Sequence, residues 1–384
     1  MRFEFTTVTR IIFGSSTLKE AGVITKEFGA RALIVTGSKP ERAAPLTEIL
    51  QRAGVSSVLF SVSGEPAITT VEQGVTLAKR ERCDTVISFG GGSAIDTGKA
   101  IAAMLTNPGE LLDYLEIIGR AKNLTQPPAP FIAIPTTAGT GAEVTRNAVL
   151  ASPEHRVKVS LRSPLMLPRI ALVDPELTLG LPRDITAASG LDALTQLIEP
   201  YLSCRANPMT DALCIEGIRH AARSLRRACE NGNDLAARED MALASLWSGK
   251  ALANAGLGAV HGFAGPIGGM FTAPHGSVCA ALLPHVMAMN LRALRERQPD
   301  GEALRKFGEV ARLLTNDTNA NADDGVRWLA ALVQDLQIPP LSRYGITPAH
   351  TTELIEKAAA ASSMKGNPLP LTADELKEVL TAAL

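Results

Sequence analysis

In the first half of the chain, short β-branched runs alternate with amphipathic stretches, and this alternation constrains the fold more than any other feature. We predict strands at residues 32–36, 55–62, 85–89 and 131–134. Stretches with helical spacing lie between them, such as residues 44–53 and 68–80. Strands that are apolar throughout and separated by helices indicate a parallel sheet that is covered on both faces.

The second half changes character near residue 180, after a Val-Asp-Pro segment at residues 173–175 closes the last strand-like run. Alanine and leucine then recur at helical spacing, with glycine and proline as punctuation. We predict helices at residues 187–202, 209–230, 235–255, 301–314, 322–336 and 373–384. Because 384 residues suit two domains, we expect an α/β nucleotide-binding domain at 1–180 and an all-helical domain at 181–384.

Composition excludes several classes of function. Charged residues are nearly balanced, with a formal net charge of −1, so nothing favours nucleic acid or a membrane surface as partner. The five cysteines form no C-x-x-C pair, and an odd number in a long chain favours free thiols in a reducing compartment. The N-terminal segment lacks the pattern of a signal peptide, and no long apolar run suggests a membrane span. We expect a cytoplasmic protein.

A glycine-rich segment, Phe-Gly-Gly-Gly-Ser-Ala-Ile-Asp at residues 89–96, is the sharpest motif of the first half. It follows a predicted strand and opens a helix-like run at 97–105. Bare glycine backbone followed by a helix N-terminus suits a pyrophosphate, and Ser93 adds a hydroxyl. A glycine-rich turn without a ligand is the alternative, because the motif is not the dinucleotide-binding G-x-G-x-x-G fingerprint.

A second polar loop follows the next predicted strand, where Thr136, Thr137, Thr140 and Thr145 alternate with glycines. In open α/β sheets, ligands bind at the carboxyl ends of strands. Two such loops on consecutive strands favour a bound nucleotide over two empty turns.

The helical half holds a group of candidate metal ligands. Asp192 and Gln196 are four residues apart, which places them on one face of a helix. His261 and His275 follow in a glycine-rich stretch. Carboxylate and imidazole suit a divalent metal such as Fe²⁺ or Zn²⁺. Structural histidines are the alternative reading, and His285 could equally be structural.

Together these segments resemble the iron-containing (group III) alcohol dehydrogenase family. The resemblance rests on FGGGSAIDTGKA, IPTTAGTGAEVT, GLDALTQLIEPYLS and VHGFAGPIGGMFTAPHGSVCAALLPHVM, which lie in order between residues 89 and 287, and on RIIFGSSTL near the start. It implies the dehydroquinate synthase-like architecture of that family, with the active site between the two domains. It also implies hydride transfer between a nicotinamide cofactor and an alcohol or carbonyl, assisted by a metal, and a homo-oligomer, such as a homodimer.

The resemblance assigns roles to individual residues. Gly91, Gly92 and Ser93 would hold the pyrophosphate, Thr136, Thr137, Thr140 and Thr145 would line the adenosine and nicotinamide side, Lys158 would approach the ribose, and Asp96 would lie near the nicotinamide. Asp192, His261 and His275 match three of the four metal ligands of the family and would be the catalytic centre.

Two positions depart from the family pattern at the metal centre. Gln196 stands where the family usually has a metal-binding histidine, so we expect a retained metal with Gln196 as ligand or neighbour. Metal-free relatives such as the maleylacetate reductases support the opposite reading. Gly265 stands where many relatives have a histidine that relays the substrate proton. Glycine transfers no proton, so water, the cofactor ribose or another side chain must substitute.

A third departure concerns the choice of cofactor. Relatives that prefer NAD often have an aspartate after the first strand, where this chain has Gly37, Ser38 and Lys39. Glycine removes the repulsion of a 2′-phosphate, and Ser38, Lys39 and Arg42 could donate to it. We therefore expect NADP(H) to be favoured over NAD(H). Solvated surface charges are the alternative interpretation of Lys39 and Arg42.

The leading interpretation is an NAD(P)-dependent alcohol dehydrogenase, or aldehyde or ketone reductase, assisted by a divalent metal. The nearest alternative is a metal-independent reductase of an acidic carbonyl compound, similar to the maleylacetate reductases. A catalytically decayed NAD(P)-binding protein and a non-redox relative of the dehydroquinate synthase type rank below both.

Overall fold

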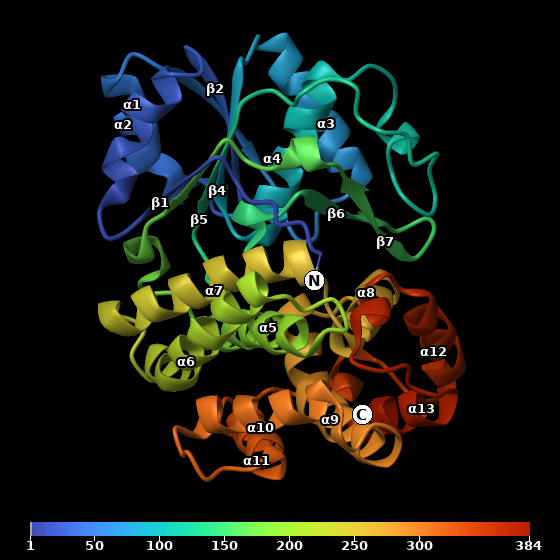
Figure 1. Ribbon diagram of the computed structural model, residues 1–384. Helices are drawn as coiled ribbons and strands as arrows, with labels where there is room; N and C mark the ends of the chain where they lie inside the picture. Colours follow the sequence, from blue (N-terminus) through green and yellow to red (C-terminus); the bar gives the residue numbers. More distant parts are fainter. Residues whose placement is uncertain (1) are drawn as a thin grey trace. The chain divides into compact units, whose positions relative to one another are not determined.

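A six-stranded parallel sheet organises the first half of the chain in the computed structural model, which describes residues 2–384 (Figure 1). The sheet has the strand order β1-β8-β5-β4-β2-β3. Its strands are β1 (Arg10–Phe13), β2 (Arg31–Thr36), β3 (Ser56–Ser61), β4 (Thr85–Gly90), β5 (Phe131–Pro135) and β8 (Ile170–Val173). The strands β6 (Asn147–Ser152) and β7 (Val157–Arg162) form a separate antiparallel pair.

The helices of this half are α1 (Ala21–Lys26), α2 (Ala44–Arg52), α3 (Ile68–Arg80) and α4 (Gly92–Thr106). Side chains on a strand alternate between the two faces. In β2, Leu33 and Val35 join one core cluster, which contains residues of α3 and α4. Ala32 and Ile34 join the other, which contains residues of α1 and α2. Apolar side chains on both faces explain why these strands are hydrophobic throughout.

The strand order reverses between β2 and β4. From β2 the chain runs outward to β3, and it then returns to the other side of β2 as β4. In an open α/β sheet this reversal leaves a crevice at the carboxyl ends of the two strands, which is the usual ligand site. The segments that begin at Gly37 and Gly91 leave the sheet at this point.

The second half is helical (Figure 1). Its helices are α5 (Arg183–Leu202), α6 (Pro208–Glu230), α7 (Leu235–Ala255), α8 (Ala259–Met270), α9 (His275–Arg297), α10 (Glu302–Thr315), α11 (Ala322–Asp335), α12 (Thr351–Ala360) and α13 (Ala373–Ala382). One continuous apolar core joins them.

The chain divides into two compact units. The sheet unit comprises residues 6–137 and 141–178, and the helical unit comprises residues 2–5, 138–140 and 179–384. The change from one unit to the other after Thr178 lies close to the predicted division at 1–180 and 181–384, which itself stays a prediction. The α/β and helical fold class agrees with the structure.

Most elements expected from the sequence lie within a few residues of their predicted bounds, but α8 and α9 were not anticipated. These two helices contain Pro266 and Pro284 and several glycines, which are residues that usually interrupt helices. Burial overrides this local preference, because α9 and the first half of α8 lie mostly in the helical core.

By length and composition α9 is the one helix within residues 2–384 that could cross a membrane, and 78% of its most apolar window is buried within the protein. A helix that is apolar and covered by its own chain is typical of a protein core.

Candidate functional site

Three loops of the sheet unit meet where the strand order reverses. A Cβ atom added to Gly90 would lie 2.7 Å from Ala94 Cβ and 3.3 Å from the backbone nitrogen of Gly37. One added to Gly91 would lie 3.2 Å from Thr137 Oγ1. At the carboxyl ends of β2, β4 and β5, glycine backbone atoms therefore pack closely against the neighbouring segments. Side chains at Gly90 or Gly91 would close this space.

Helix α4 begins within this junction. Gly91 is its N-cap residue and makes no side-chain capping bond, so the positive end of the helix is not covered by a cap at this position. An anion of the size of a phosphate is stabilised at such an end by N–H groups and the helix dipole. Gly91, Gly92 and Ser93 thus lie at the start of a helix, close to Thr137, and their binding of a phosphate stays a prediction.

Asp96 and Lys99 follow on α4 and belong to a buried polar group. The Lys99 ammonium donates to Thr145 Oγ1 at 2.8 Å and to the Asn147 carbonyl at 2.7 Å. Asp96 Oδ2 accepts from the Val149 amide at 3.0 Å. Burial raises the pKa of the Asp96 carboxyl and lowers that of Lys99. This group fixes α4 to the segment that leads into β6.

These contacts bear on three predicted cofactor residues. The Thr145 hydroxyl accepts a hydrogen bond from Lys99 and donates one to the Ala142 carbonyl. The Asp96 carboxyl accepts a hydrogen bond from the Val149 amide. Lys158 Nζ lies 3.0 Å from Glu65 Oε1, and the lysine side chain is buried. Each of the three already has a protein partner, so their predicted contacts with a cofactor stay predictions.

In the loop after β2, a Cβ atom added to Gly37 meets no atom within 4 Å among the described residues. Arg42 donates to the Leu177 carbonyl at 3.1 Å, which holds its side chain near the end of β8. Ser38 and Lys39 lie between these two positions. The loop thus has room at Gly37 and cations near it.

In the helical unit, four side chains from three helices converge on one point. Asp192 of α5, His261 of α8, and His275 and Cys279 of α9 each offer one ligand atom, and these atoms all lie within 4.8 Å of one another. We call this group the metal cluster. Asp192 Oδ1 lies 3.3 Å from His261 Nε2 and 3.7 Å from His275 Nε2.

Close helix packing produces the convergence. A Cβ atom on Gly276 would lie 2.3 Å from the Ala188 carbonyl oxygen, so α9 starts directly against the backbone of α5. Asp192 lies one turn beyond Ala188 on α5, and His275 precedes Gly276. The glycine therefore brings the acidic residue and the histidine together.

Glu199 orients His261. Its Oε2 atom lies 2.6 Å from His261 Nδ1, and its Oε1 atom accepts from the Val260 amide at 2.7 Å. A carboxylate in this position keeps a proton on Nδ1, so Nε2 is the ring nitrogen that faces the metal cluster. Glu199 lies seven residues after Asp192 on the same helix, so one face of α5 supplies a ligand and its supporting group.

Charges within the metal cluster shift the pKa values of its members in opposite directions. Burial would lower the pKa of His261, but Cys279 and Glu199 outweigh it and raise the pKa well above its ordinary value. Burial would raise the pKa of Cys279, but His261 and His275 hold it below its ordinary value. The thiolate is therefore favoured beside two imidazoles, which is the form that binds metals.

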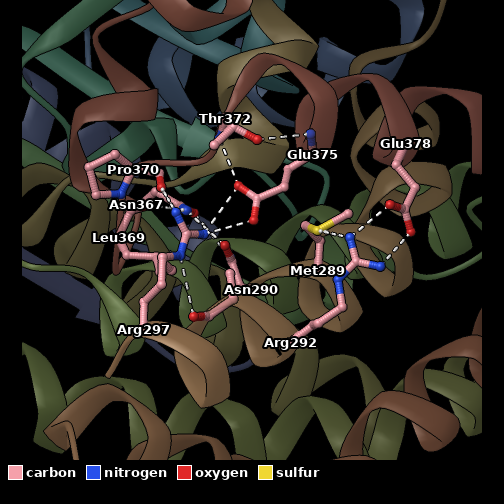
Figure 2. Close-up of polar contacts among 11 residues, drawn as sticks. Met289, Asn290, Arg292, Arg297, Asn367, Leu369, Pro370, Thr372, Glu375 and Glu378 are labelled. Carbon is pink, nitrogen blue, oxygen red and sulfur yellow. Dashed lines mark hydrogen bonds and ion pairs between the residues drawn. The ribbon is translucent and has the colours of Figure 1, made fainter. Parts of the chain in front are cut away.

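Behind the metal cluster, Asn367 secures the start of α8. Its Oδ1 atom accepts from the Ala259 amide at 3.2 Å, and its amide group exchanges two hydrogen bonds with Asn290 of α9, at 2.8 and 3.1 Å. Figure 2 shows this pair beside the ion pair between Arg297 and Glu375. The two histidine-bearing helices are thus joined by a buried amide pair.

Comparison with known proteins now decides the family. The model described as "Iron-containing alcohol dehydrogenase" matches residues 8–175, and "Fe-containing alcohol dehydrogenase family, C-terminal" matches residues 186–384. The chain belongs to the iron-containing alcohol dehydrogenase family. The 1,3-propanediol dehydrogenase of Citrobacter freundii is 37% identical over 97% of this chain and 96% of its own. The NAD-dependent methanol dehydrogenase of Bacillus methanolicus is 34% identical over 97% of each.

A solved structure of a 1,3-propanediol oxidoreductase covers 100% of both chains with a TM-score of 0.92 and 35% identity. The fold expected from the resemblance is thereby confirmed. The chain is an oxidoreductase that acts on CH–OH groups, as its relatives of the iron-containing alcohol dehydrogenase family are.

The two departures from the family pattern have distinct surroundings. Gln196 Nε2 donates to the Gly139 carbonyl at 3.0 Å. Its amide nitrogen is therefore already hydrogen-bonded within the helical unit, to which residues 138–140 belong. A Cβ atom added to Gly265 meets nothing within 4 Å in the described part of the chain. Space for a longer side chain therefore exists at this position, where the resemblance led us to expect a relay histidine in many relatives.

Sequence reasoning missed Cys279, Glu199 and Asn367. Cys279 was grouped with idle thiols, although it lies four residues after His275 and so shares a helix face with it. The same spacing argument had already linked Asp192 to Gln196. It was not applied here because α9 was not recognised as a helix. Nothing in the sequence alone connects Asn367 with Ala259, since the contact spans 108 residues.

Proposed function

We propose that this protein is a nicotinamide-dependent alcohol dehydrogenase, or carbonyl reductase, whose hydride transfer is assisted by a divalent metal in the metal cluster. The observation that carries the proposal is the convergence of Asp192, His261 and His275 around one point in the helical unit. Support for the cofactor comes from the glycine junction at the reversal of strand order. Cleavage or formation of a C–H bond by hydride transfer requires such a cofactor.

The residues of the metal cluster fit a cation. Asp192 is 2% exposed, and its Oδ1 atom is buried without a hydrogen-bond partner within residues 2–384. An unsatisfied buried carboxylate oxygen is costly, and a bound cation at this point would satisfy it. Two imidazoles and a carboxylate are a common ligand set for catalytic Zn²⁺ and for non-haem Fe²⁺.

When bound, a divalent metal supplies Lewis-acid chemistry, which polarises a carbonyl and favours the alkoxide form of an alcohol. Asp192, His261 and His275 would hold it, and Glu199 contacts His261 Nδ1, which directs Nε2 inward. The His275 side chain is 33% exposed, whereas those of Asp192 and His261 are buried. In this proposal, solvent and substrate reach the metal cluster on the side of His275.

The sheet unit holds the cofactor in this proposal. Gly91, Gly92 and Ser93 at the start of α4 bind the pyrophosphate through backbone amides. The loop after β2 receives the adenosine ribose. Since Gly37 carries no carboxylate and Ser38, Lys39 and Arg42 are donors nearby, we infer that a 2′-phosphate is accepted and that NADP(H) is preferred.

Reconstitution tests the proposal. Purified full-length protein is stripped of metal with a chelator, reloaded with Zn²⁺ or Fe²⁺, and assayed with NADPH and NADH against a panel of aldehydes and short alcohols. The expected result is activity only after metal is restored, with a higher kcat/KM for NADPH. Full activity of the metal-free protein would instead favour the metal-independent reductase of acidic carbonyl compounds. Cofactor binding without turnover would favour a decayed enzyme.

Two further parts of the proposal concern the protein's setting. The five cysteines are free thiols, which suits a reducing compartment such as the cytoplasm. We also infer a homo-oligomer, and light scattering of the purified protein would test this.

A further inference from the structure

Cys279 has no role in the proposed function so far, yet it is one of the four members of the metal cluster. Its side chain is buried, and its Sγ atom lies 3.6 Å from His261 Nε2 and 3.7 Å from His275 Nε2. The other four thiols of the chain lie outside this group. Cys279 thus contacts both histidines that the proposed function assigns to the metal.

Four of the six distances among the ligand atoms are close to those of a tetrahedral site. A tetrahedral Zn²⁺ ion has bonds of about 2.0 Å to nitrogen or oxygen and about 2.3 Å to sulfur. Those bonds require distances of roughly 3.3 Å between an oxygen and a nitrogen, and roughly 3.6 Å between a nitrogen and a sulfur. The observed distances are 3.3 and 3.7 Å from Asp192 Oδ1 to the two Nε2 atoms, and 3.6 and 3.7 Å from Cys279 Sγ to the same atoms.

Helix geometry places the thiol in this position. His275 and Cys279 are four residues apart on α9, so their side chains project from one face. Asp192 Oδ1, which lacks a hydrogen-bond partner in the described residues, faces the same two histidines. Gln196, in contrast, has its amide nitrogen bound to the Gly139 carbonyl.

We propose that Cys279 is the fourth protein ligand of the metal, which makes a set of one carboxylate, two imidazoles and one thiolate, and that this set selects Zn²⁺ over Fe²⁺. The inference rests on the proposed function, which places a metal at Asp192, His261 and His275. A thiolate is a soft ligand, and it strengthens the binding of zinc more than that of ferrous iron. Zinc also binds a given set of nitrogen and sulfur ligands more tightly than ferrous iron does. Catalytic zinc sometimes becomes five-coordinate, so a zinc ion with four protein ligands can still accept a further ligand during catalysis.

Cobalt substitution tests the ligand directly, without an activity assay. The full-length protein is stripped of metal and loaded with Co²⁺, and its absorption spectrum is recorded. A thiolate ligand gives a sulfur-to-cobalt charge-transfer band in the near ultraviolet. We expect this band in the wild type and in Cys214→Ala, which removes another buried thiol. It should be missing in Cys279→Ala.

Zinc affinity provides the second measurement, by competition with a chromogenic chelator. Cys279→Ala should weaken zinc binding by more than about 100-fold, which exceeds the usual effect of losing a residue that only supports a ligand. Gln196→Ala should weaken it by less than about 10-fold. Circular dichroism of each variant confirms that it is folded, and X-ray absorption of the zinc-loaded wild type should show one sulfur at about 2.3 Å.

The outcomes separate the two proposals. A wild type that binds zinc and shows activity, but has no thiolate band and keeps its affinity in Cys279→Ala, overturns the role of Cys279 and leaves the proposed function standing. A wild type that binds neither zinc nor cobalt, and is active without them, overturns the metal-assisted mechanism as well. If Gln196→Ala loses the metal while Cys279→Ala retains it, the glutamine is the fourth ligand.

Discussion

Gly37 is the residue on which the proposed cofactor preference depends. A carboxylate at the end of the second strand would repel a 2′-phosphate and accept a hydrogen bond from a ribose hydroxyl. Because a Cβ atom at Gly37 meets no neighbour within 4 Å in residues 2–384, an aspartate fits there without displacing the loop. We predict that Gly37→Asp lowers kcat/KM for NADPH by at least about 10-fold and leaves that for NADH unchanged or higher, as measured by steady-state kinetics.

The matched control is Gly37→Asn, which adds nearly the same volume without charge and should retain most of the NADPH activity. Equal losses in the two variants would show that space, rather than charge, is limiting at this position. A wild type that already uses NADH at least as well as NADPH would contradict the preference itself.

Glu199 gives a second prediction at the residue scale. Glu199→Gln keeps the shape of the side chain but removes the charge that holds the proton on His261 Nδ1. We expect zinc affinity to fall by about 10–100-fold, as is usual when the group supporting a metal-bound histidine is changed. Competition with a chelator measures it. Glu230→Gln, at an exposed position on α6, is the control and should bind zinc as the wild type does. Unchanged affinity in Glu199→Gln would refute the orienting role.

Gly265 gives a third prediction. The space around it admits a longer side chain, so Gly265→His should fold. A proton relay contributes only when a partner accepts the proton at hydrogen-bond distance, and no atom of the described residues lies within 4 Å of a Cβ atom at Gly265. We predict that Gly265→His raises kcat with ethanol or 1,3-propanediol by less than about 10-fold. A large gain in initial-rate assays would contradict this.

The candidate site could be anticipated only in part. Asp192, His261 and His275 were identified from residue type and family resemblance, and the structure brings them together. Cys279 and Glu199 were missed because the contacts depend on which helix faces meet. Spacing of three or four residues reveals a shared face, but it cannot reveal what that face packs against.

Among the elements, α8 and α9 matter most, because they carry three members of the metal cluster. The first backbone amides of α8 have no partner within their own helix. Asn367 Oδ1 and Glu199 Oε1 accept from two of them, at Ala259 and Val260. A Cβ atom on Gly258 would lie 2.8 Å from Glu199 Oε1, so a side chain at this position would displace the Glu199 carboxylate.

This arrangement predicts a large stability effect at Asn367, which is not a member of the metal cluster. Asn367→Ala leaves the Ala259 amide and the Asn290 side chain buried without their partner. We expect a loss on the order of 3 kcal/mol in the free energy of unfolding, measured by urea denaturation. Asn367 and Asn290 act as one unit, so the double variant with Asn290→Ala should lose less than the sum of the two single losses. Additive losses would show that the pair is not coupled.

The strands and amphipathic helices that were predicted are present, because their patterns are local, but β1, β6, β7, α1 and α12 were not predicted. The bounds of α3 and α7 agree with the sequence analysis at both ends. In contrast, α8 and α9 are buried nearly all round over much of their length and carry glycine and proline, so neither periodicity nor propensity marks them as helices. Only tertiary packing explains why these segments are helical.

At the scale of the whole molecule, the two units have separate cores and separate proposed ligands. A ligand that binds only the folded state stabilises the unit that holds it. We predict that zinc at 100 times its Kd raises the unfolding free energy of the helical unit by about 2.7 kcal/mol and that removal by a chelator reverses this. Calorimetry of metal-free and zinc-loaded protein measures the shift, and an unchanged thermogram would contradict metal binding in the folded state.

In the proposed mechanism, a nicotinamide cofactor and a metal bound by the metal cluster act together on a CH–OH group. The most direct test is the rate of NADPH oxidation by metal-stripped protein with a reactive aldehyde, before and after one equivalent of Zn²⁺ is added. We predict negligible turnover before addition and restored turnover after it, with no restoration in a His261→Ala variant. Equal turnover in the stripped and reloaded proteins would contradict this mechanism.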